Sequence, residues 1–242
     1  MTSLLRGLSS ILPTRKNARA SPPDRPKPPR ICPGERTWPE LLRAPPDAIR
    51  RKAAILFIDL SGFTGVSERI GLDGTLAILA DFYGIVETTV LDEGGVVLNY
   101  LGDGALVAFG GGPECEDARS AVQAALRLLD RVSDWISRQP EHRALAGVRI
   151  GAHVGEVLVA RLGGVAHRPM TILGDNVNVA SRLLELAPAR GSAIVFSKPL
   201  LDAAGPALPE GAQQLLRAGR LAAIRGRSER LVVHIWTGTS MC

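Results

Sequence analysis

Short apolar runs separated by turn-forming residues occur throughout the chain after residue 52. Buried strands have this pattern, because they are brief, apolar and bounded by glycine or polar turns. The runs that predict strands lie at 53–59, 96–98, 105–109, 148–154, 157–162, 170–173, 193–196 and 231–236. A Gly-Asp-Gly turn around Asp103 predicts that the second and third runs form a β-hairpin. Gly155-Glu156 predicts a break between the fourth and fifth runs.

Between these runs, apolar residues recur three and four positions apart, which predicts amphipathic helices. Ile78, Phe82 and Val86 share one such face, and Gly94-Gly95 ends that helical stretch. The predicted helices include residues 78–90, 114–138 and 175–186, with a small helix after Ser197. This order of elements predicts an α+β fold in which helices cover a mixed, mainly antiparallel sheet.

The first 50 residues have a different composition from the rest. They contain 10 of the 17 prolines and little apolar periodicity. Such a segment cannot build a core, so we expect residues 1–51 to form a disordered basic arm and 52–240 to form one domain. A proline-rich docking ligand is the alternative for the arm. The apolar residues of 1–13 leave a weak membrane or partner contact open.

The net charge of +5 belongs to this arm. Residues 1–52 carry 12 Lys and Arg against 4 Asp and Glu, whereas the remainder carries 17 against 20. A nucleic-acid-binding domain would need a basic folded part, so we expect no nucleic-acid partner. Cys32, Cys115 and Cys242 form neither a disulfide framework nor a zinc pair. With no signal peptide and no long apolar span, we expect a cytoplasmic protein.

The candidate chemistry begins with two aspartates. Asp59 ends the first predicted strand, and Asp103 lies in the hairpin turn. If the hairpin pairs beside the first strand, both carboxylates reach one edge of the sheet. Two such groups repel each other unless a cation lies between them, and Mg²⁺ is commonly held by one or two carboxylates plus phosphates. The pair predicts a phosphoryl-transfer site with two metal ions, although an aspartate at a turn often needs no metal.

Residues 61–64 support a nucleotide at this site. They follow Asp59 and read Ser-Gly-Phe-Thr at the start of a predicted helix. Gly62 allows the backbone to approach a ligand, and free N–H groups at a helix N-terminus bind phosphate oxygens. The metal ions and the phosphates would then share one site.

A second polar cluster lies in residues 173–183. Asn178 and Arg182 are four positions apart and therefore share one face of the predicted helix. An arginine aimed at a phosphate site stabilises charge that develops in a transition state. On spacing alone, an ordinary exposed Asn and Arg with Asp175 as helix cap is the better interpretation.

Four segments together resemble the catalytic domain of class III adenylate and guanylate cyclases of the bacterial type. They are residues 57–64, 101–109, 149–157 and 173–183, in the order found in that family. The resemblance covers roughly 53–236 and implies a ferredoxin-like α+β core. It also implies a head-to-tail homodimer whose active sites lie at the subunit interface.

Several roles follow from the resemblance, position by position. It implies that Asp59 and Asp103 bind two Mg²⁺ or Mn²⁺ ions, with the Leu60 carbonyl as a further ligand. The amides of Gly62, Phe63 and Thr64 would hold the triphosphate. A basic residue late in the chain would also hold it, and of the two candidates, Arg225 and Arg227, we take Arg227. Asn178 would orient the ribose, and Arg182 would stabilise the transition state, both from the partner subunit.

The positions that select the base depart from the commonest pattern of the family. Adenylate-forming members usually carry Lys four residues before the second metal aspartate, and this chain has Asn99. Thr171, seven residues before Asn178, occurs in many bacterial adenylate-forming members. An Asn amide can donate to adenine or accept from guanine, so both bases stay open and ATP is favoured.

The sequence therefore predicts an ATP cyclase that forms 3′,5′-cyclic AMP and pyrophosphate. The alternatives are a GTP cyclase and a nucleotide-binding or dimerising regulatory domain that has lost turnover. No P-loop, nucleophile elbow or clustered histidine favours another class of enzyme.

Overall fold

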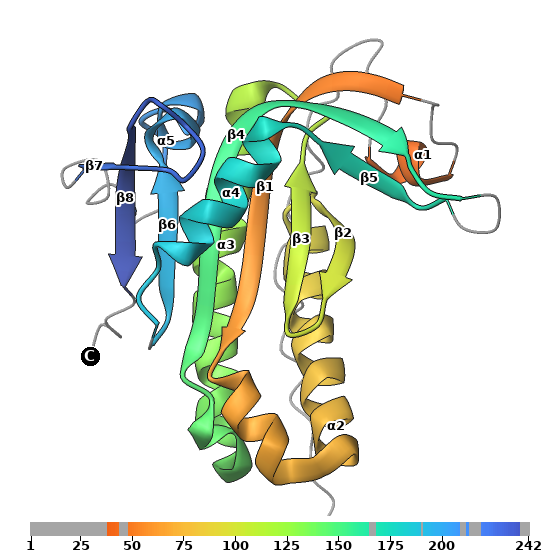
Figure 1. The fold of residues 1–242 in the computed structure, drawn as a ribbon, viewed down its shortest axis with the longest axis vertical. Helices are drawn as coiled ribbons and strands as arrows, with labels where there is room; N and C mark the ends of the chain where they lie inside the picture. The colour runs from red at the N-terminus through yellow and green to blue at the C-terminus, as the bar shows by residue number, and fades with distance from the viewer. Residues whose placement is uncertain are drawn as a thin grey trace, which may run out of the picture.

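The computed structural model describes residues 38–43, 48–164, 168–189, 191–208, 212 and 219–237. Its centre is an eight-stranded sheet with the order β2-β3-β1-β4-β6-β8-β7, and β5 pairs with β4 (Figure 1). The strands are β1 (Ala48–Ser61), β2 (Val96–Leu101), β3 (Gly104–Phe109), β4 (Gly147–Arg161), β5 (Met170–Leu173), β6 (Ala193–Ser197), β7 (Arg220–Ala222) and β8 (Leu231–Thr237). Only β4 and β6 pair in parallel among the described strands.

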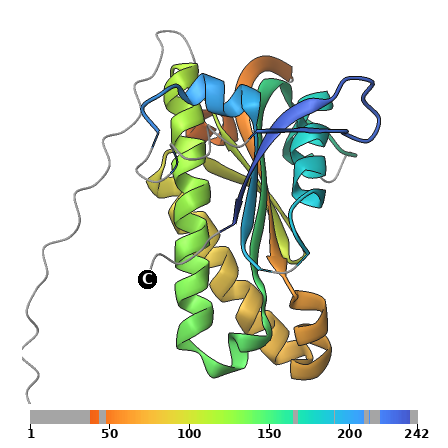
Figure 2. The same ribbon diagram turned by 90° about the vertical axis from the view of Figure 1, so that its left-hand side faces the viewer.

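Helices cover both faces of this sheet, as Figure 2 shows from the side. The helices are α1 (Trp38–Arg43), α2 (Phe63–Asp92), α3 (Glu114–Arg138), α4 (Asp175–Glu185), α5 (Lys198–Ala204) and the 3₁₀ helix η1 (Pro140–Ala144). α2 and α3 lie on one face and α4 lies on the other. The predicted mixed α+β architecture, with a mainly antiparallel sheet, is therefore confirmed.

The side chains of β1 alternate between the two faces of the sheet, which explains why helices must cover both faces. Leu56 and Ile58 lie in the main core with Phe82 of α2, whereas Ile55 lies in a second cluster with Leu106 of β3. Successive side chains of a strand point to opposite faces, so a strand that is apolar at every position is buried on both sides. This is why residues 53–58, which precede Asp59, are continuously apolar.

The predicted break between two strands at Gly155-Glu156 is wrong, because β4 runs continuously from Gly147 to Arg161. Gly155 is required by close packing instead. A Cβ there would lie 2.3 Å from Cγ of Asn176 in α4. Glycine inside a strand often marks such an approach of another chain segment, and sequence alone does not distinguish it from a turn.

The folded part also begins earlier than the predicted boundary at residue 52. β1 starts at Ala48, and α1 lies before it. Trp38 and Leu41 of α1 are 1% and 0% exposed and belong to the second cluster. Residues 38–43 and 48–51 are therefore structured, while the rest of the predicted arm lies outside the described residues.

α2 is long and apolar enough, by composition alone, to meet a test for a membrane-crossing helix. Its buried residues, among them Val66, Phe82 and Val86, form a stripe against the core. Gly71 has a φ of 72° and marks a kink within the helix. The apolar character of α2 is accounted for in part by this packing, which is the usual origin of such a composition in a core helix.

Candidate active site

Strand pairing places Asp59 and Asp103 next to each other. β1 and β3 are antiparallel, with Asp59 opposite Gly104. The Leu60 N–H donates to the Asp103 carbonyl oxygen at 2.9 Å. A Cβ on Gly104 would lie 2.5 Å from the Ile58 carbonyl oxygen, so only glycine permits this approach. The structure therefore brings together the two aspartates that the sequence singles out.

The electrostatics of Asp103 show that the two carboxylates interact. Burial raises the pKa of Asp103 above its ordinary value, and the negative charge of Asp59 raises it further. A hydrogen bond from its own backbone and the positive charge of Arg149 act in the opposite direction. Two partly buried carboxylates in one another's field favour binding of a cation.

Arg149 is the site residue to which the sequence analysis assigned no role. It lies on β4 directly opposite Asp59. Its Nε donates to Asp59 Oδ2 at 3.1 Å, and its Nη2 donates to the same oxygen. The two side chains are 27% and 20% exposed. Arg149 belongs to a segment that carries the family resemblance, but only the pairing of β1 with β4 shows which acidic residue it faces.

Tyr83 of α2 supports the turn that carries Asp103. Its hydroxyl donates to the Gly102 carbonyl oxygen, and its ring stacks on Tyr100 with centroids 4.0 Å apart. Gly102 has a φ of 66°, which favours glycine. Burial raises the pKa of Tyr83, and the nearby Asp103 charge raises it further. The helical pattern predicted a buried face for α2 but did not reveal this polar contact.

α2 begins directly beside the two aspartates. Gly62 precedes it with a φ of 83°, and a Cβ there would lie 3.1 Å from the Ala146 backbone nitrogen. Phe63 is half-buried against the core and Thr64 is exposed. The first N–H groups of a helix have no intrahelical acceptor, so this turn presents donors to an anionic ligand.

The predicted helix that carries Asn178 and Arg182 is confirmed as α4. It packs so closely on β4 that a Cβ on Gly151 would lie 2.3 Å from the Ala180 carbonyl oxygen. Asn178 is exposed, whereas Arg182 is half-buried and donates to the Arg225 carbonyl oxygen. In the described part of the chain, no hydrogen bond or ion pair joins either residue to Asp59 or Asp103.

Arg227, the predicted phosphate ligand near the C-terminus, lies at the other end of α4. Its Nε is 3.3 Å from Asp175 Oδ2 in an ion pair. The 225–227 turn therefore contacts α4 twice, once through this ion pair and once through the Arg225 carbonyl oxygen. Neither contact reaches the two aspartates.

The two predicted base-selecting residues lie on two strands, β2 and β5, that are not neighbours in the sheet. Asn99 of β2 is exposed and stands opposite Leu106 of β3. Thr171 of β5 is half-buried and pairs with Ala160. β2 and β5 contact each other although they are not paired. The fold thus brings the two positions into one region, and their role in base selection stays a prediction.

The donor set fits divalent cations that are completed by phosphate. Among the described residues, no group of three or more His, Cys, Asp and Glu could hold a metal by itself. Mg²⁺ rarely uses an all-protein cage and commonly takes one or two carboxylates with substrate oxygens and water. Asp59 and Asp103 supply that many carboxylates, and burial of Asp103 beside the negative charge of Asp59 favours a cation at this position.

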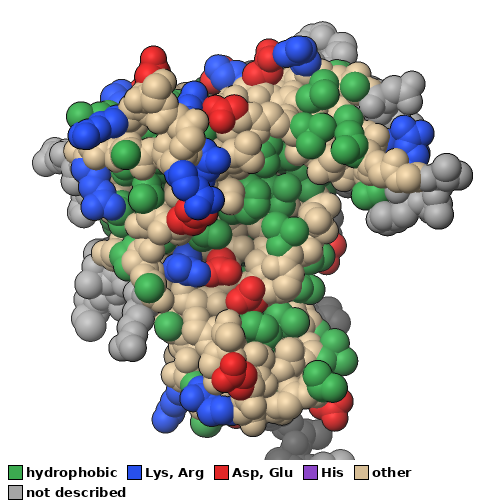
Figure 3. Space-filling model, viewed as in Figure 1, with side chains coloured by type: hydrophobic (Ala, Val, Ile, Leu, Met, Phe, Trp, Pro, Cys, Tyr) green, Lys and Arg blue, Asp and Glu red, His purple; other side chains and the backbone are tan. Residues whose placement is uncertain are grey.

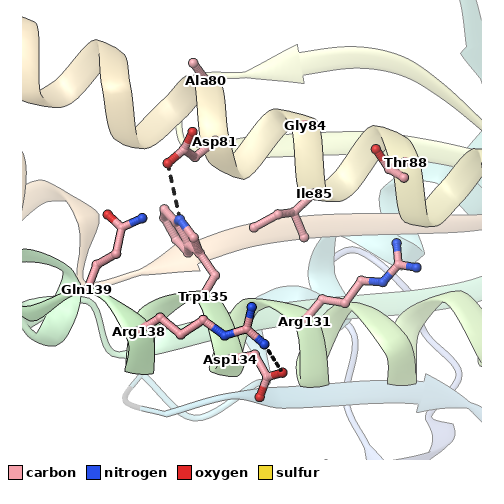
Figure 4. A pocket seen from close by; sticks show the side chains of 10 residues that line it. All are labelled: Ala80, Asp81, Gly84, Ile85, Thr88, Arg131, Asp134, Trp135, Arg138 and Gln139. Carbon is pink, nitrogen blue, oxygen red and sulfur yellow. Dashed lines mark hydrogen bonds and ion pairs between the residues drawn. The ribbon is translucent and has the colours of Figure 1, made fainter. Parts of the chain in front are cut away.

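A cavity of about 680 Å³ lies away from this site, between α2 and α3 (Figure 4). Its polar side chains largely satisfy one another. The Trp135 indole donates to Asp81 at 3.4 Å, and Arg138 pairs with Asp134 at 3.3 Å. None of the predicted site residues lines this cavity. The size of a cavity therefore does not identify the active site here, and the paired carboxylates of Asp59 and Asp103 are the better indication of where it lies.

Comparison with known proteins identifies relatives of this arrangement. The family model described as "Adenylate and Guanylate cyclase catalytic domain" matches residues 48–198. The chain is 30% identical over 160 residues to "Adenylate cyclase" of Anabaena cylindrica, covering 64% of this chain and 31% of that protein. It is 26% identical over 194 residues to "Adenylate cyclase 2" of Rhizobium meliloti, covering 80% of this chain and 52% of that protein. The chain thus spans about half or less of the curated relatives it matches.

Solved structures show the same fold. The adenylyl cyclase CyaB from P. aeruginosa matches with a TM-score of 0.64 and 22% identity, covering 81% of this chain and 98% of that chain. The guanylyl cyclase Cya2 matches with a TM-score of 0.65 and 24% identity over the same shares. The fold resembles an adenylyl cyclase and a guanylyl cyclase equally well, so the fold alone does not indicate which nucleotide base is recognised.

Proposed function

Since this chain belongs to the family of adenylate and guanylate cyclase catalytic domains, we propose that it converts ATP to 3′,5′-cyclic AMP and pyrophosphate. One observation carries the proposal. The backbone hydrogen bond from Leu60 to Asp103 holds the two aspartates side by side where β1 ends and β3 begins, before the first turn of α2. Cation ligands and phosphate-binding amides then occupy one continuous surface.

Each group of the site has a separate task in binding the nucleotide. The amides around Gly62, Phe63 and Thr64 bind triphosphate oxygens at the start of α2. Asp59 and Asp103, with the Leu60 carbonyl, hold two divalent cations. Arg149 already neutralises one of these carboxylates through its ion pair with Asp59, and we propose that it also contacts the same phosphates.

The proposed reaction is an in-line displacement at the α-phosphorus. The ribose 3′-oxygen attacks, the bond to the bridging oxygen of pyrophosphate breaks, and the hydroxyl proton leaves to solvent. When bound, the cations lower the pKa of the attacking hydroxyl and neutralise the phosphate charge. Asn178 orients the ribose, and Arg182 donates to phosphate oxygens as negative charge develops.

We propose that two copies of the chain share each site. Among the described residues, Arg182 donates to the Arg225 carbonyl oxygen of its own chain and forms no hydrogen bond or ion pair with the aspartates, so a second copy would supply it. The face that carries α4 also has apolar side chains beside α4, over β2 and β3, next to charges of both signs (Figure 3). Leu101 and Leu173 are 47% and 37% exposed near this region. Exposed apolar groups of this kind are typical of interaction surfaces.

ATP is the proposed substrate because Asn99 and Thr171 can together recognise adenine. The Asn99 amide can donate to a ring nitrogen, and the Thr171 hydroxyl can accept from the exocyclic amine. The two bacterial relatives are named as adenylate cyclases, which points the same way. GTP is the competing substrate, since the Asn99 carbonyl oxygen could accept from guanine.

The deciding experiment measures cyclic nucleotide formation by the purified chain with Mn²⁺ or Mg²⁺ and either ATP or GTP. We expect 3′,5′-cyclic AMP and a higher kcat/KM for ATP. A higher kcat/KM for GTP would mean that GTP, and not ATP, is the substrate. No product from either nucleotide at high protein concentration would favour the alternative of a regulatory domain without turnover.

An equal mixture of Asp59→Ala and Arg182→Ala chains should regain activity that each lacks alone. Failure of this mixture would contradict shared sites.

A further inference from the structure

His153 lies on β4 beneath α4 and is only 3% exposed. Both nitrogens of its ring have partners. Nδ1 is 2.8 Å from the Ser197 hydroxyl, and Nε2 is 3.1 Å from the Asn176 side-chain oxygen. The ring therefore connects three elements, because Ser197 ends β6 and Asn176 lies in the first turn of α4.

The hydrogen bonds around the ring determine its tautomer. The Asn176 amide nitrogen donates to the Glu156 carbonyl oxygen at 2.9 Å, which turns the amide oxygen toward His153. That oxygen can only accept, so Nε2 must carry the proton. The Ser197 hydroxyl accepts from the Leu200 N–H and donates its own proton to Nδ1. Every donor in this chain of bonds has one acceptor when the ring is neutral.

The surroundings also favour the neutral ring. Burial lowers the pKa of His153, and the positive charge of Arg227 lowers it further. The hydrogen bond to Asn176 and the negative charge of Asp175 oppose this shift but do not reverse it. A ring that is neutral at physiological pH keeps the Nε2 donor and the Nδ1 acceptor that the two contacts require.

The partner of this ring fixes the start of α4. Asn176 reaches over Gly155, where no larger residue would fit, and bonds to the backbone of β4 and to His153. Asn178 and Arg182 follow it by two and six positions on the same helix. A rigid helix transmits a shift of its first turn to both residues, and small displacements of groups that contact a transition state cost much activity.

We propose that His153 is a positioning residue for the cyclase reaction, which sets α4 through Asn176 so that Asn178 and Arg182 meet the substrate held by the partner copy. The inference rests on the proposed function and adds a residue outside the site. His153 itself touches neither nucleotide nor cation. Its effect should therefore appear in the catalysis performed by α4 and not in the binding performed by the two aspartates.

Two substitutions distinguish the effect of the hydrogen bond between His153 and Asn176 from the effect of the volume that the His153 ring fills. His153→Phe fills the space but donates nothing to Asn176, so we expect kcat to fall about tenfold to a hundredfold with KM changed less than about threefold. In His153→Gln, the terminal amide can take the place of Nε2 and restore most of kcat. His142→Phe is the matched control, because His142 is also buried, at 4% exposed, but packs on Trp135 away from α4. Equal loss of kcat in both Phe variants, or no rescue by Gln, would overturn the proposal.

Mixed dimers test which site the residue serves. A His153→Phe chain has intact aspartates, and an Asp59→Ala chain has an intact α4, so their mixture should contain one complete site and regain activity. The mixture of His153→Phe with Arg182→Ala should stay weak, because both chains are defective in α4. The opposite pattern would show that His153 acts on the aspartates of its own chain and would overturn the proposal. The mixture of Asp59→Ala with Arg182→Ala tests shared sites separately.

A measurement without substrate distinguishes failure of this proposal from failure of the proposed function. The ¹⁵N shifts of the His153 ring should show a neutral ring protonated at Nε2 near pH 7. Amide hydrogen exchange in the first turn of α4 should be faster in His153→Phe than in His142→Phe. A ring protonated at Nδ1, or unchanged exchange in α4, would overturn the positioning role even if the protein forms no cyclic nucleotide.

Discussion

At the scale of single residues, the Asp103 carboxylate that we propose as a cation ligand makes folding less favourable. Asp103 is partly buried beside Asp59, and burial is the larger cause of its raised pKa. A carboxyl whose pKa is higher in the folded chain than in the unfolded chain loses stability as it ionises. The loss develops as pH rises from the unfolded pKa through the folded pKa. Function and stability therefore oppose each other at this position.

The substitution Asp103→Asn should accordingly stabilise the fold while it abolishes turnover. Without divalent cations, we expect a higher Tm than that of the unmodified protein at pH 7 to 8. The difference should vanish at a pH well below the ordinary aspartate value of 3.8, where both forms are uncharged. Turnover should fall at least about a hundredfold. Thermal unfolding across pH measures the effect, with exposed Asp73→Asn as control, and a lower Tm for Asp103→Asn at pH 7 would refute it.

Gly226 limits where the guanidinium of Arg182 can lie. Its φ is 79°, and a Cβ there would be 3.0 Å from Arg182 Nη1. Gly226→Ala should cost about 1 kcal/mol of stability through backbone strain and also lower kcat about tenfold by displacing Arg182. Gly205→Ala is the matched control, since Gly205 has a φ of 73° and no atom near its added methyl. Equal effects of both variants on kcat would contradict this role of Gly226.

The sequence predicts a site residue when the pattern that marks it lies in the neighbouring residues. Asp59 and Asp103 could be found because Asp59 ends an apolar run and Asp103 lies in a glycine-flanked turn, and local pattern is enough for that. Arg149 and His153 lie in a segment that the sequence analysis identified, yet their partners lie 90 and 23 positions away. Such partners depend on strand register and helix packing, which no local pattern encodes.

At the scale of elements, the periodicity of apolar residues predicted strands and helices correctly where one face of the element is buried along its whole length. α3 was predicted with its observed bounds because one face is consistently apolar. Gly155 misled the prediction for β4, since a glycine under a helix and a glycine in a turn look alike in sequence. α1 was missed because its segment is rich in proline and only two of its side chains, Trp38 and Leu41, are known to be buried in the core.

Truncation measures what α1 contributes. Removal of residues 1–37 keeps α1 and should leave Tm nearly unchanged, because the composition of that segment predicts no core. Removal of 1–47 also removes Trp38 and Leu41 from the second cluster, which they share with residues of β1, β3, β4 and β5. Loss of a buried Trp costs about 3 kcal/mol or more, so we expect Tm to fall by at least about 5 °C relative to the shorter truncation. Equal Tm values for the two truncations would show that α1 adds no stability.

At the scale of the whole molecule, the proposed site divides into two separate parts within one copy of the chain. The aspartates and the first turn of α2 form one half, and α4 with Asn178 and Arg182 forms the other. In the described part of the chain, no hydrogen bond or ion pair joins Arg182 to Asp59. Two-fold symmetry would pair each half with its complement in a second copy, so that a dimer contains two sites. Activity then depends on protein concentration.

An inactive chain should therefore activate dilute wild-type protein. At concentrations where wild-type copies are mostly dissociated, activity per chain should fall on dilution. Excess Asp59→Ala chain, inactive alone, should raise it again, because its α4 completes the site that begins with Asp59 of a wild-type chain. A double variant, Asp59→Ala with Arg182→Ala, forms the same dimers without that arginine and should lower activity instead. Initial rates against concentration of added chain give the test, and activation by both inactive chains would mean that pairing alone, without a shared arginine, is sufficient.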